Sequence, residues 1–240
     1  MNTLFAAVSG ELVKIRSMFK YKLIFILSLA GMLVVSATGI LGVTKLNLPY
    51  NSLNFALQFL APISMFMLAS DLLAGEVASG EIKVWFLRPI SRGKLFFAKL
   101  IAICIYELCI LACFFLISLT ASIVSAGIST VSVGSVFSAY LVGIVPLITF
   151  GALAVMCGAV TKSGTTCFFF SIFIYLGLWA VSIVFPKISS VLFTSYLGIS
   201  SMVIGSTIPY KSLVTGLLIL IGYAVAFVSA GVLRFQSREI

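Results

Sequence analysis

Few side chains in this sequence could do chemistry, because its 240 residues contain no histidine and only six acids. One of these acids, Glu107, lies well inside a long apolar run, where a carboxyl group is costly to bury and normally faces the protein interior or a partner. Glu107 either takes up a proton or contacts a cationic substrate, or it makes an interhelical hydrogen bond as a protonated acid. The sequence leaves both roles open.

Patterns for catalysis are incomplete elsewhere in the chain. Ser91-x2-Lys94 has the spacing of a serine nucleophile and its lysine, but it lies in a turn and is better explained as the start of a helix. Gly93-Lys94 lacks the earlier glycine and the following Ser or Thr of a phosphate-binding loop. We therefore do not expect the chain to be an enzyme or to bind a cofactor of its own.

The five cysteines favour packing over metal binding. Cys109 and Cys113 lie four residues apart, on one face of a helix, with Cys104 and Glu107 nearby, so a thiolate metal site is conceivable. The absence of histidine and the apolar surroundings argue against it, since a free cysteine in such a run behaves as a small hydrophobic residue. We expect neither a metal site nor a disulfide framework.

The elements that position these residues are membrane-spanning helices. Hydrophobic residues make up 62% of the chain and charged residues only 9%, with a mean hydropathy of +1.26. Each of six apolar runs is long enough to cross about 30 Å of hydrocarbon as a helix. The runs cover residues 23–43, 53–74, 97–124, 134–160, 165–185 and 213–234. The sequence predicts an all-α, polytopic membrane protein with six transmembrane helices in a single domain, residues 1–240.

The basic residues predict the orientation in the membrane. Twelve of the fifteen Lys and Arg residues fall in segments on the same side as the N-terminus, and the exceptions are Lys45, Lys187 and Lys211. Because cytoplasmic segments carry the excess of positive charge, we expect a multi-pass protein of the cell membrane with both termini in the cytoplasm. The net charge of +9 is then explained by topology and by contact with lipid headgroups, without nucleic acid.

The N-terminal residues 2–20 have the pattern of an amphipathic helix. Apolar side chains recur there at spacings of three and four, namely Leu4, Phe5, Val8, Leu12, Ile15 and Phe19. The charged residues Glu11, Lys14, Arg16 and Lys20 lie mostly off this stripe. The pattern predicts a helix along the inner membrane surface, and the alternative is a helical extension of the first span with a basic collar. Farther on, Pro62 interrupts the second run and predicts a kink whose freed carbonyl is satisfied by a neighbouring helix.

The most distinctive segment is the charged stretch of residues 76–99 between the second and third apolar runs. Charged side chains alternate there with large apolar ones, so that residues 76–87 can form a short helix. Pro89 disfavours a continued helix and predicts a turn before the third span. A helix with Trp85 and Phe86 on one side docks either in the headgroup region or in a groove of a partner protein. Charge alone does not decide between the two.

This stretch resembles the signature between the second and third spans of ABC-2 type transporter permeases. The matching residues are Glu76-x3-Gly80-Glu81-Ile82, then Phe86-Leu87-x-Pro89-Ile90-Ser91-Arg92, then Lys94-Leu95-x3-Lys99. The layout of an amphipathic N-terminal helix and six spans is similar to that family over nearly the full chain. One departure is Glu81, where the family commonly has Thr.

The resemblance implies a role for each part of the chain. Residues 1–22 correspond to a connecting helix, residues 75–95 to a cytoplasmic coupling loop seated in a cleft of an ATPase subunit, and residues 186–212 to an extracellular re-entrant segment. The last assignment agrees with two apolar pieces, at 191–197 and 199–208, that are too short to span a bilayer. The implied ATPase-coupling residues are Glu76, Gly80, Glu81, Trp85, Phe86, Arg88, Pro89, Ser91 and Arg92.

The resemblance further implies the permease subunit of an ATP-driven exporter. Two ATPase subunits would bind ATP and Mg, and a second permease chain, identical or not, would complete a path for an amphipathic or lipophilic substrate such as a drug or antimicrobial peptide. One alternative is an ATP-independent channel or secondary carrier that uses Glu107, and another is a scaffold whose basic stretch binds anionic lipid. Secondary carriers commonly contain internal repeats, and the stretch 76–99 has no counterpart after the fifth run.

Overall fold

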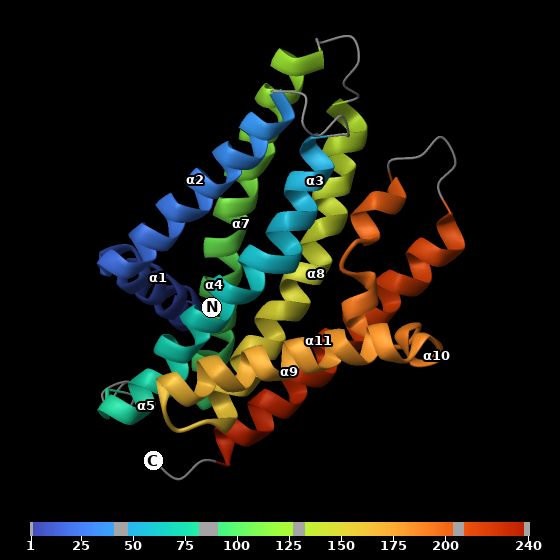
Figure 1. Ribbon diagram of the computed structural model, residues 1–240. Helices are drawn as coiled ribbons and strands as arrows, with labels where there is room; N and C mark the ends of the chain where they lie inside the picture. The colour runs from blue at the N-terminus through green and yellow to red at the C-terminus, as the bar shows by residue number, and fades with distance from the viewer. Residues whose placement is uncertain (1, 41–47, 82–90, 127–132, 204–208, 238–240) are drawn as a thin grey trace.

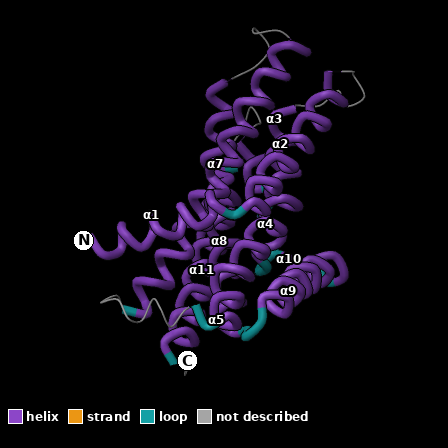
Figure 2. Tube along the Cα trace, turned by 90° about the vertical axis from the view of Figure 1, so that its left-hand side faces the viewer, coloured by secondary structure: helices purple, strands orange, loops and turns teal. Residues whose placement is uncertain are grey.

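A computed structural model describes residues 2–40, 48–81, 91–126, 133–203 and 209–237 of the chain (Figure 1). Every regular element in these ranges is helical, as Figure 2 shows. The α-helices are α1 (Asn2–Ser17), α2 (Phe19–Ile40), α3 (Leu48–Phe55), α4 (Ala61–Ala69), α5 (Glu76–Ser79), α7 (Arg92–Ala126), α8 (Val133–Val160), α9 (Gly164–Val184), α10 (Pro186–Ser189) and α11 (Tyr210–Gln236). Two π-helices, η1 (Ala56–Leu60) and η2 (Ser70–Gly75), and two 3-10 helices, η4 (Phe193–Tyr196) and η5 (Ile199–Val203), complete the set.

Six helical stretches in the described ranges are long and apolar enough to cross a membrane. They are Phe19–Ala37, Leu48–Ser79, Arg92–Val124, Val133–Val160, Gly164–Val184 and Tyr210–Gln236. Each overlaps one of the six apolar runs, so the prediction of an all-helical protein with six candidate spans is confirmed. Helices of this length satisfy their own backbone hydrogen bonds, which is what a chain needs in order to cross a bilayer. The molecule is a multi-pass membrane protein by this criterion.

The second span is one continuous helical stretch from α3 to α5, with a π-helix on each side of α4. Pro62, at the start of α4, has no N–H group, which leaves the Gln58 carbonyl in η1 without its usual partner one turn later. The Tyr175 hydroxyl of α9 donates to this carbonyl across 2.8 Å. The predicted interruption at Pro62 therefore takes the form of a π-helix, and a neighbouring helix satisfies the freed carbonyl as expected.

Helix α8 runs through the middle of the bundle (Figure 1), and its glycines allow close contact with the second span. A Cβ atom added at Gly158 would lie 2.9 Å from the Leu73 Cβ and 3.2 Å from the Ala69 carbonyl oxygen. At the third span, a Cβ on Gly151 would lie 3.1 Å from the Cys104 sulfur. Small residues on α8 thus permit packing within this chain.

Helix α1 is separate from α2, because the helix is interrupted at Met18 and the two helices diverge in direction (Figures 1 and 2). This arrangement excludes a continuous extension of the first span. The predicted apolar stripe is only partly the buried face: Ile15 is buried, whereas Phe5 and Phe19 are largely exposed. Glu11, predicted off the stripe, is fully buried against α7. The inward face of α1 therefore carries an acidic side chain, whose partner is Lys99 on α7.

Between α9 and α11 the chain packs back against the bundle through η4 and η5. Phe193 of η4 is fully buried, and its ring lies edge-on to those of Phe150 and Phe227. The two apolar pieces predicted between residues 191 and 208 contain single turns of 3-10 helix, with the expected break at Gly198. Residues 204–208 lie outside the described ranges.

Candidate functional site

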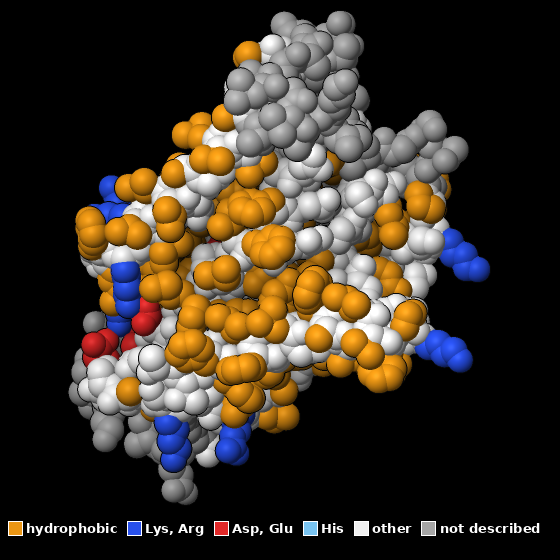
Figure 3. All heavy atoms as spheres, in the orientation of Figure 1, with side chains coloured by type: hydrophobic (Ala, Val, Ile, Leu, Met, Phe, Trp, Pro, Cys, Tyr) orange, Lys and Arg blue, Asp and Glu red, His pale blue; other side chains and the backbone are white. Residues whose placement is uncertain are grey.

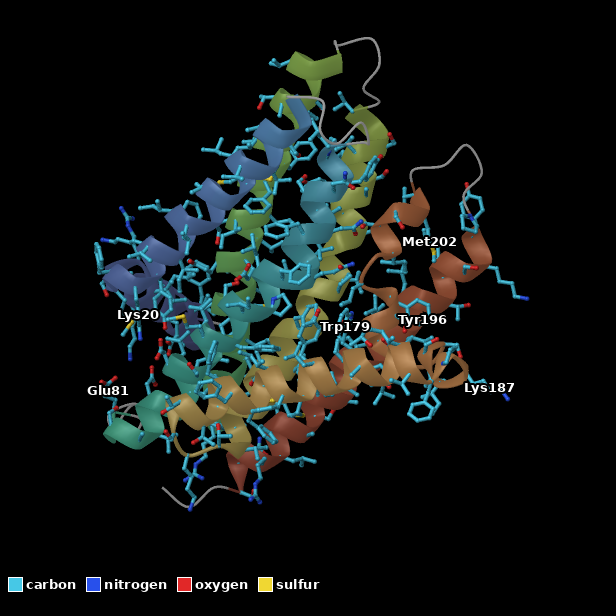
Figure 4. The ribbon with its side chains drawn as sticks, in the orientation of Figure 1. Lys20, Glu81, Trp179, Lys187, Tyr196 and Met202 are labelled. Atoms are coloured by element: carbon cyan, nitrogen blue, oxygen red, sulfur yellow. The ribbon has the colours of Figure 1, made fainter. Side chains whose placement is uncertain are left out.

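Five charged side chains meet where α1 crosses the end of the second span and the start of the third. This charge cluster consists of Glu11, Lys14, Glu76, Glu81 and Lys99. Acidic and basic side chains gather at the edge of the molecule beside α1 and α5, while hydrophobic side chains are spread over the visible face of the bundle (Figure 3). Figure 4 shows Glu81 at this edge, at the end of α5.

The cluster is a continuous chain of ion pairs. The Lys99 Nζ donates to Glu11 Oε1 and to Glu76 Oε2, each across 2.7 Å. The Lys14 Nζ donates to Glu76 Oε1 and to Glu81 Oε2, each across 2.8 Å. Glu76 thus accepts one lysine on each carboxylate oxygen. It joins α1, the end of the second span and α7 through charge-assisted hydrogen bonds.

Burial falls steadily along this chain of pairs. Lys99 and Glu11 are fully buried and Glu76 is 2% exposed, whereas Lys14 is 25% and Glu81 59% exposed. Removing one partner of a buried pair typically costs about 3–5 kcal/mol, because the other charge stays buried without compensation. A pair at the surface contributes about 1 kcal/mol or less. The inner half of the cluster therefore determines how firmly α1, α5 and α7 are held together.

Glu11 is the member of the cluster whose carboxyl group is incompletely hydrogen-bonded. Its Oε2 atom is buried and has no hydrogen-bond partner among the described residues. Burial raises the pKa of Glu11 above its ordinary value of 4.5, although the neighbouring Lys99 acts in the opposite direction. The cluster contains three carboxyl groups and two ammonium groups, so a proton on Glu11 makes it neutral.

We expect Glu11→Gln to flatten the dependence of stability on pH. A carboxyl whose pKa is higher in the folded than in the unfolded state stabilises the fold at low pH, and this contribution is lost as the pH rises through the raised pKa. The wild-type melting temperature in detergent should therefore fall as the pH rises above about 4.5, the ordinary pKa of a glutamate, and that of Glu11→Gln should fall less over the same range. Glutamine keeps an oxygen for the Lys99 Nζ but has no proton to lose.

Glu81→Gln provides a control of opposite sign. The hydrogen bond from Lys14 lowers the pKa of Glu81, so the stabilisation from Glu81 is present at neutral pH and is lost as the pH falls. Burial alone would lower the pKa of Lys14, but its hydrogen bonds to Glu76 and Glu81 raise this pKa above its ordinary value. Equal pH slopes for wild type and Glu11→Gln would show that Glu11 does not titrate in this range.

A second group of contacts lies beside the cluster and ties the start of α2 to η2. Asp71, in η2, forms an ion pair with Lys20 and accepts a hydrogen bond from the Tyr21 hydroxyl. The Tyr106 hydroxyl of α7 donates to the Tyr21 carbonyl across 2.9 Å. Figure 4 shows Lys20 on the same side of the bundle as Glu81. The first three spans and α1 are thus connected by polar contacts at one end of the bundle.

The structure describes five of the nine predicted coupling residues. Glu76 and Glu81 belong to the charge cluster. Gly80 has a φ of 76°, in the left-handed region that favours glycine, and it ends α5 at Ser79. The predicted helix over residues 76–87 is therefore wrong at this point, because the left-handed glycine terminates it after one turn. Residues 82–90, which include Trp85, Phe86, Arg88 and Pro89, lie outside the described ranges.

The remaining two coupling residues begin α7. The Ser91 Oγ accepts the Lys94 backbone N–H across 3.4 Å, which is the contact of an N-cap, so the interpretation of this pair as a helix start is confirmed. Arg92 is half-buried, and its Nη1 donates to the Gln236 carbonyl at the end of α11 across 3.0 Å. Arg92 thus joins the third and sixth spans of this chain.

Glu107 lies apart from the charge cluster, about 12 Å farther along α7 than Lys99 at 1.5 Å per residue. It is 3% exposed and is hydrogen-bonded to the Ser64 hydroxyl of α4. A small cavity of about 10 Å³ lies beside it, between η1, α4, α7 and α8. The described residues contain no group of His, Cys, Asp and Glu side chains that could hold a metal ion.

Comparison with known families places the whole bundle in one family. A family model matches residues 5–240, which is nearly the full chain. The chain belongs to the DUF2705 family. The description of this family is a protein of unknown function. A search of curated proteins found no match.

For this member of the DUF2705 family, sequence reasoning missed three residues of the charge cluster as a site. Glu11, Lys14 and Lys99 were not among the expected coupling residues. A signal was present for Glu11, since it lies three residues after Val8 and four before Ile15, at the spacing of the buried face. Lys99 lies within an apolar helix, where a buried partner is the rule for a charged side chain.

Proposed function

We propose that this chain is the permease subunit of an ATP-driven exporter of the ABC-2 type. Six candidate spans in an all-helical chain support a transport role. The sequence lacks a phosphate-binding loop, so a separate ATPase, present in two copies, binds ATP and Mg and supplies the energy. A second permease chain, identical or different, completes the path across the cell membrane.

The proposed coupling role rests on one observation: residues of the charge cluster flank residues 82–90 in the sequence on both sides. Glu76 and Glu81 precede this segment, Lys99 follows it, and all three are bonded through lysine to α1 or to one another. Movement of a partner against the segment is then transmitted to α1, the second span and the third span together. Salt bridges that tie helices rigidly are suited to transmit such a movement.

The remaining parts of the proposal concern the membrane. Helix α1 lies along the inner surface as a connecting helix, in contact with lipid headgroups, and both termini are cytoplasmic. Residues 186–212 form a re-entrant segment on the outer side, which caps the export path. No nucleic acid is involved.

The proposed substrate is an amphipathic or lipophilic molecule such as a drug or antimicrobial peptide. Phe169, Phe173 and Trp179 of α9 are about half exposed or more, so they face either lipid, the more common outcome on a spanning helix, or an apolar path for such a substrate.

The proposal is tested by purification of the chain from its native host in mild detergent, with identification of the proteins that accompany it. A phosphate-loop ATPase should be recovered in near-stoichiometric amount and should be lost in Arg88→Glu, which reverses a charge in the proposed coupling loop. Lys187→Glu makes the same charge change on α10, and it should keep the ATPase. A wild-type chain that purifies alone contradicts the proposal.

A second candidate function is an ATP-independent channel or secondary carrier. The observation that favours it is the buried carboxyl of Glu107 in the third span, beside a small cavity. Ion or substrate flux in vesicles that contain only this chain, lost in Glu107→Gln, would support this function over the exporter.

A further inference from the structure

The hydrogen bonds around Ser64 indicate which of Glu107 and Ser64 carries the hydrogen in the contact between them. The Ser64 hydroxyl has one hydrogen and faces three oxygens: the Leu60 carbonyl at 2.7 Å, the Ala61 carbonyl at 3.2 Å, and Glu107 Oε1. A serine inside a helix commonly donates to the carbonyl four residues earlier, which here is that of Leu60. With its hydrogen used there, Ser64 can only accept from Glu107. The contact then needs a hydrogen on the carboxyl group.

The surroundings of Glu107 favour the neutral acid for an independent reason. The cavity beside it is lined from η1, α4, α7 and α8 by apolar side chains, namely Ala56, Leu57, Leu60, Ala61, Ile110, Leu111 and Leu147. Two titratable side chains on the same helix, Cys104 and Tyr106, lie close enough to be affected by the charge of Glu107, and neither is a cation. A carboxylate placed here would lose its hydration without gaining a compensating charge.

The cavity also offers a route for exchange. Its volume of about 10 Å³ is near the minimum for a single water molecule. It borders η1, and π-helical turns are frequent at functional sites. Glu107 is the polar group in the lining of the cavity, so a water molecule that enters this space would bind at the carboxyl and would be the acceptor of its proton.

We propose that Glu107 and Ser64 constitute a proton-binding site that fastens α4 to α7. In the occupied state Glu107 is a carboxylic acid that donates to Ser64 Oγ, and Ser64 donates to the Leu60 carbonyl. On release, the O–H bond of the acid breaks, its electron pair stays on the carboxylate, and the proton passes to water in the cavity. The bare carboxylate then competes with Leu60 for the serine hydrogen and draws water between the two helices. This proposal does not depend on the proposed ATPase partner, because both residues of the site belong to this chain.

Infrared spectroscopy of the purified chain tests this directly, because a carboxylic acid has a C=O stretch that a carboxylate lacks. With only six acidic side chains in the sequence, single substitutions can assign the band. At neutral pH the wild type should show an acid band that disappears in Glu107→Gln and remains in Glu11→Gln. Glutamine is neutral and can donate to Ser64, so this variant should fold.

Two further variants make the outcome decisive. Ser64→Ala keeps the acid but removes its acceptor, so the band should remain and move to higher frequency. Glu81→Gln removes an exposed carboxylate outside the spans and should leave the band unchanged. Identical spectra for wild type and Glu107→Gln in the acid region would show that Glu107 is ionised and would overturn the proposal. If the frequency of the band is the same in Ser64→Ala as in the wild type, Glu107 does not donate to Ser64 and the proposed contact between them is wrong.

Discussion

Lys99→Met should destabilise the protein by about 3–5 kcal/mol, the typical cost of removing one partner from a buried ion pair. The Lys99 ammonium is fully buried between Glu11 and Glu76, and without it two carboxyl groups face each other inside the protein. For a chain of this size, the expected fall in melting temperature is about 6–20 °C. Thermal unfolding in detergent at neutral pH measures this fall.

Lys94→Met is the matched control, because Lys94 is exposed and lies five residues earlier on the same helix. A surface substitution of this kind usually changes stability by about 0.5 kcal/mol or less. The double variant Lys99→Met with Glu11→Gln should recover part of the loss, since only Glu76 is then left charged beside Lys14. Equal effects of the two single substitutions would mean that the inner pair does not hold α1 to α7.

Glu76→Gln should uncouple ATP hydrolysis from transport, if the chain works as proposed. Glu76 is the only described residue that receives both lysines of the cluster, and the amide keeps its size but loses its charge. Coupling free energies between sites are typically about 1–3 kcal/mol. We therefore expect about a tenfold fall in substrate exported per ATP hydrolysed in vesicles that contain permease and ATPase.

Glu81→Gln is the control for this experiment, as it removes the same charge at the exposed end of the same cluster. Its export per ATP should stay within about twofold of wild type, because exposed pairs contribute little. If both variants export normally, the charge cluster is a structural anchor and does not carry the movement. If Glu76→Gln loses the ATPase altogether, Glu76 acts in assembly and not in coupling.

Features that depend on neighbouring residues in the chain were predictable. The six spans follow from apolar runs, because a helix in lipid must pair all of its backbone groups within itself. The Pro62 interruption follows from a missing N–H, and the helix start at Ser91 follows from a side-chain cap. Gly80 shows the limit of such patterns. The alternation of charged and apolar residues favoured a helix through residue 87, but a left-handed glycine ends it at Ser79.

The sequence by itself therefore determined the class of protein, the number and approximate bounds of its spans, and the importance of Glu76 and Glu107 as acids next to or within apolar runs. Only the tertiary structure decided their partners. Lys99 is 88 residues from Glu11, and Lys14 is 62 residues from Glu76. The energy of an ion pair depends on distance in space and on burial, and neither leaves a periodic pattern along the chain. The buried face of α1 thus carries a glutamate because α7 places the Lys99 ammonium opposite it.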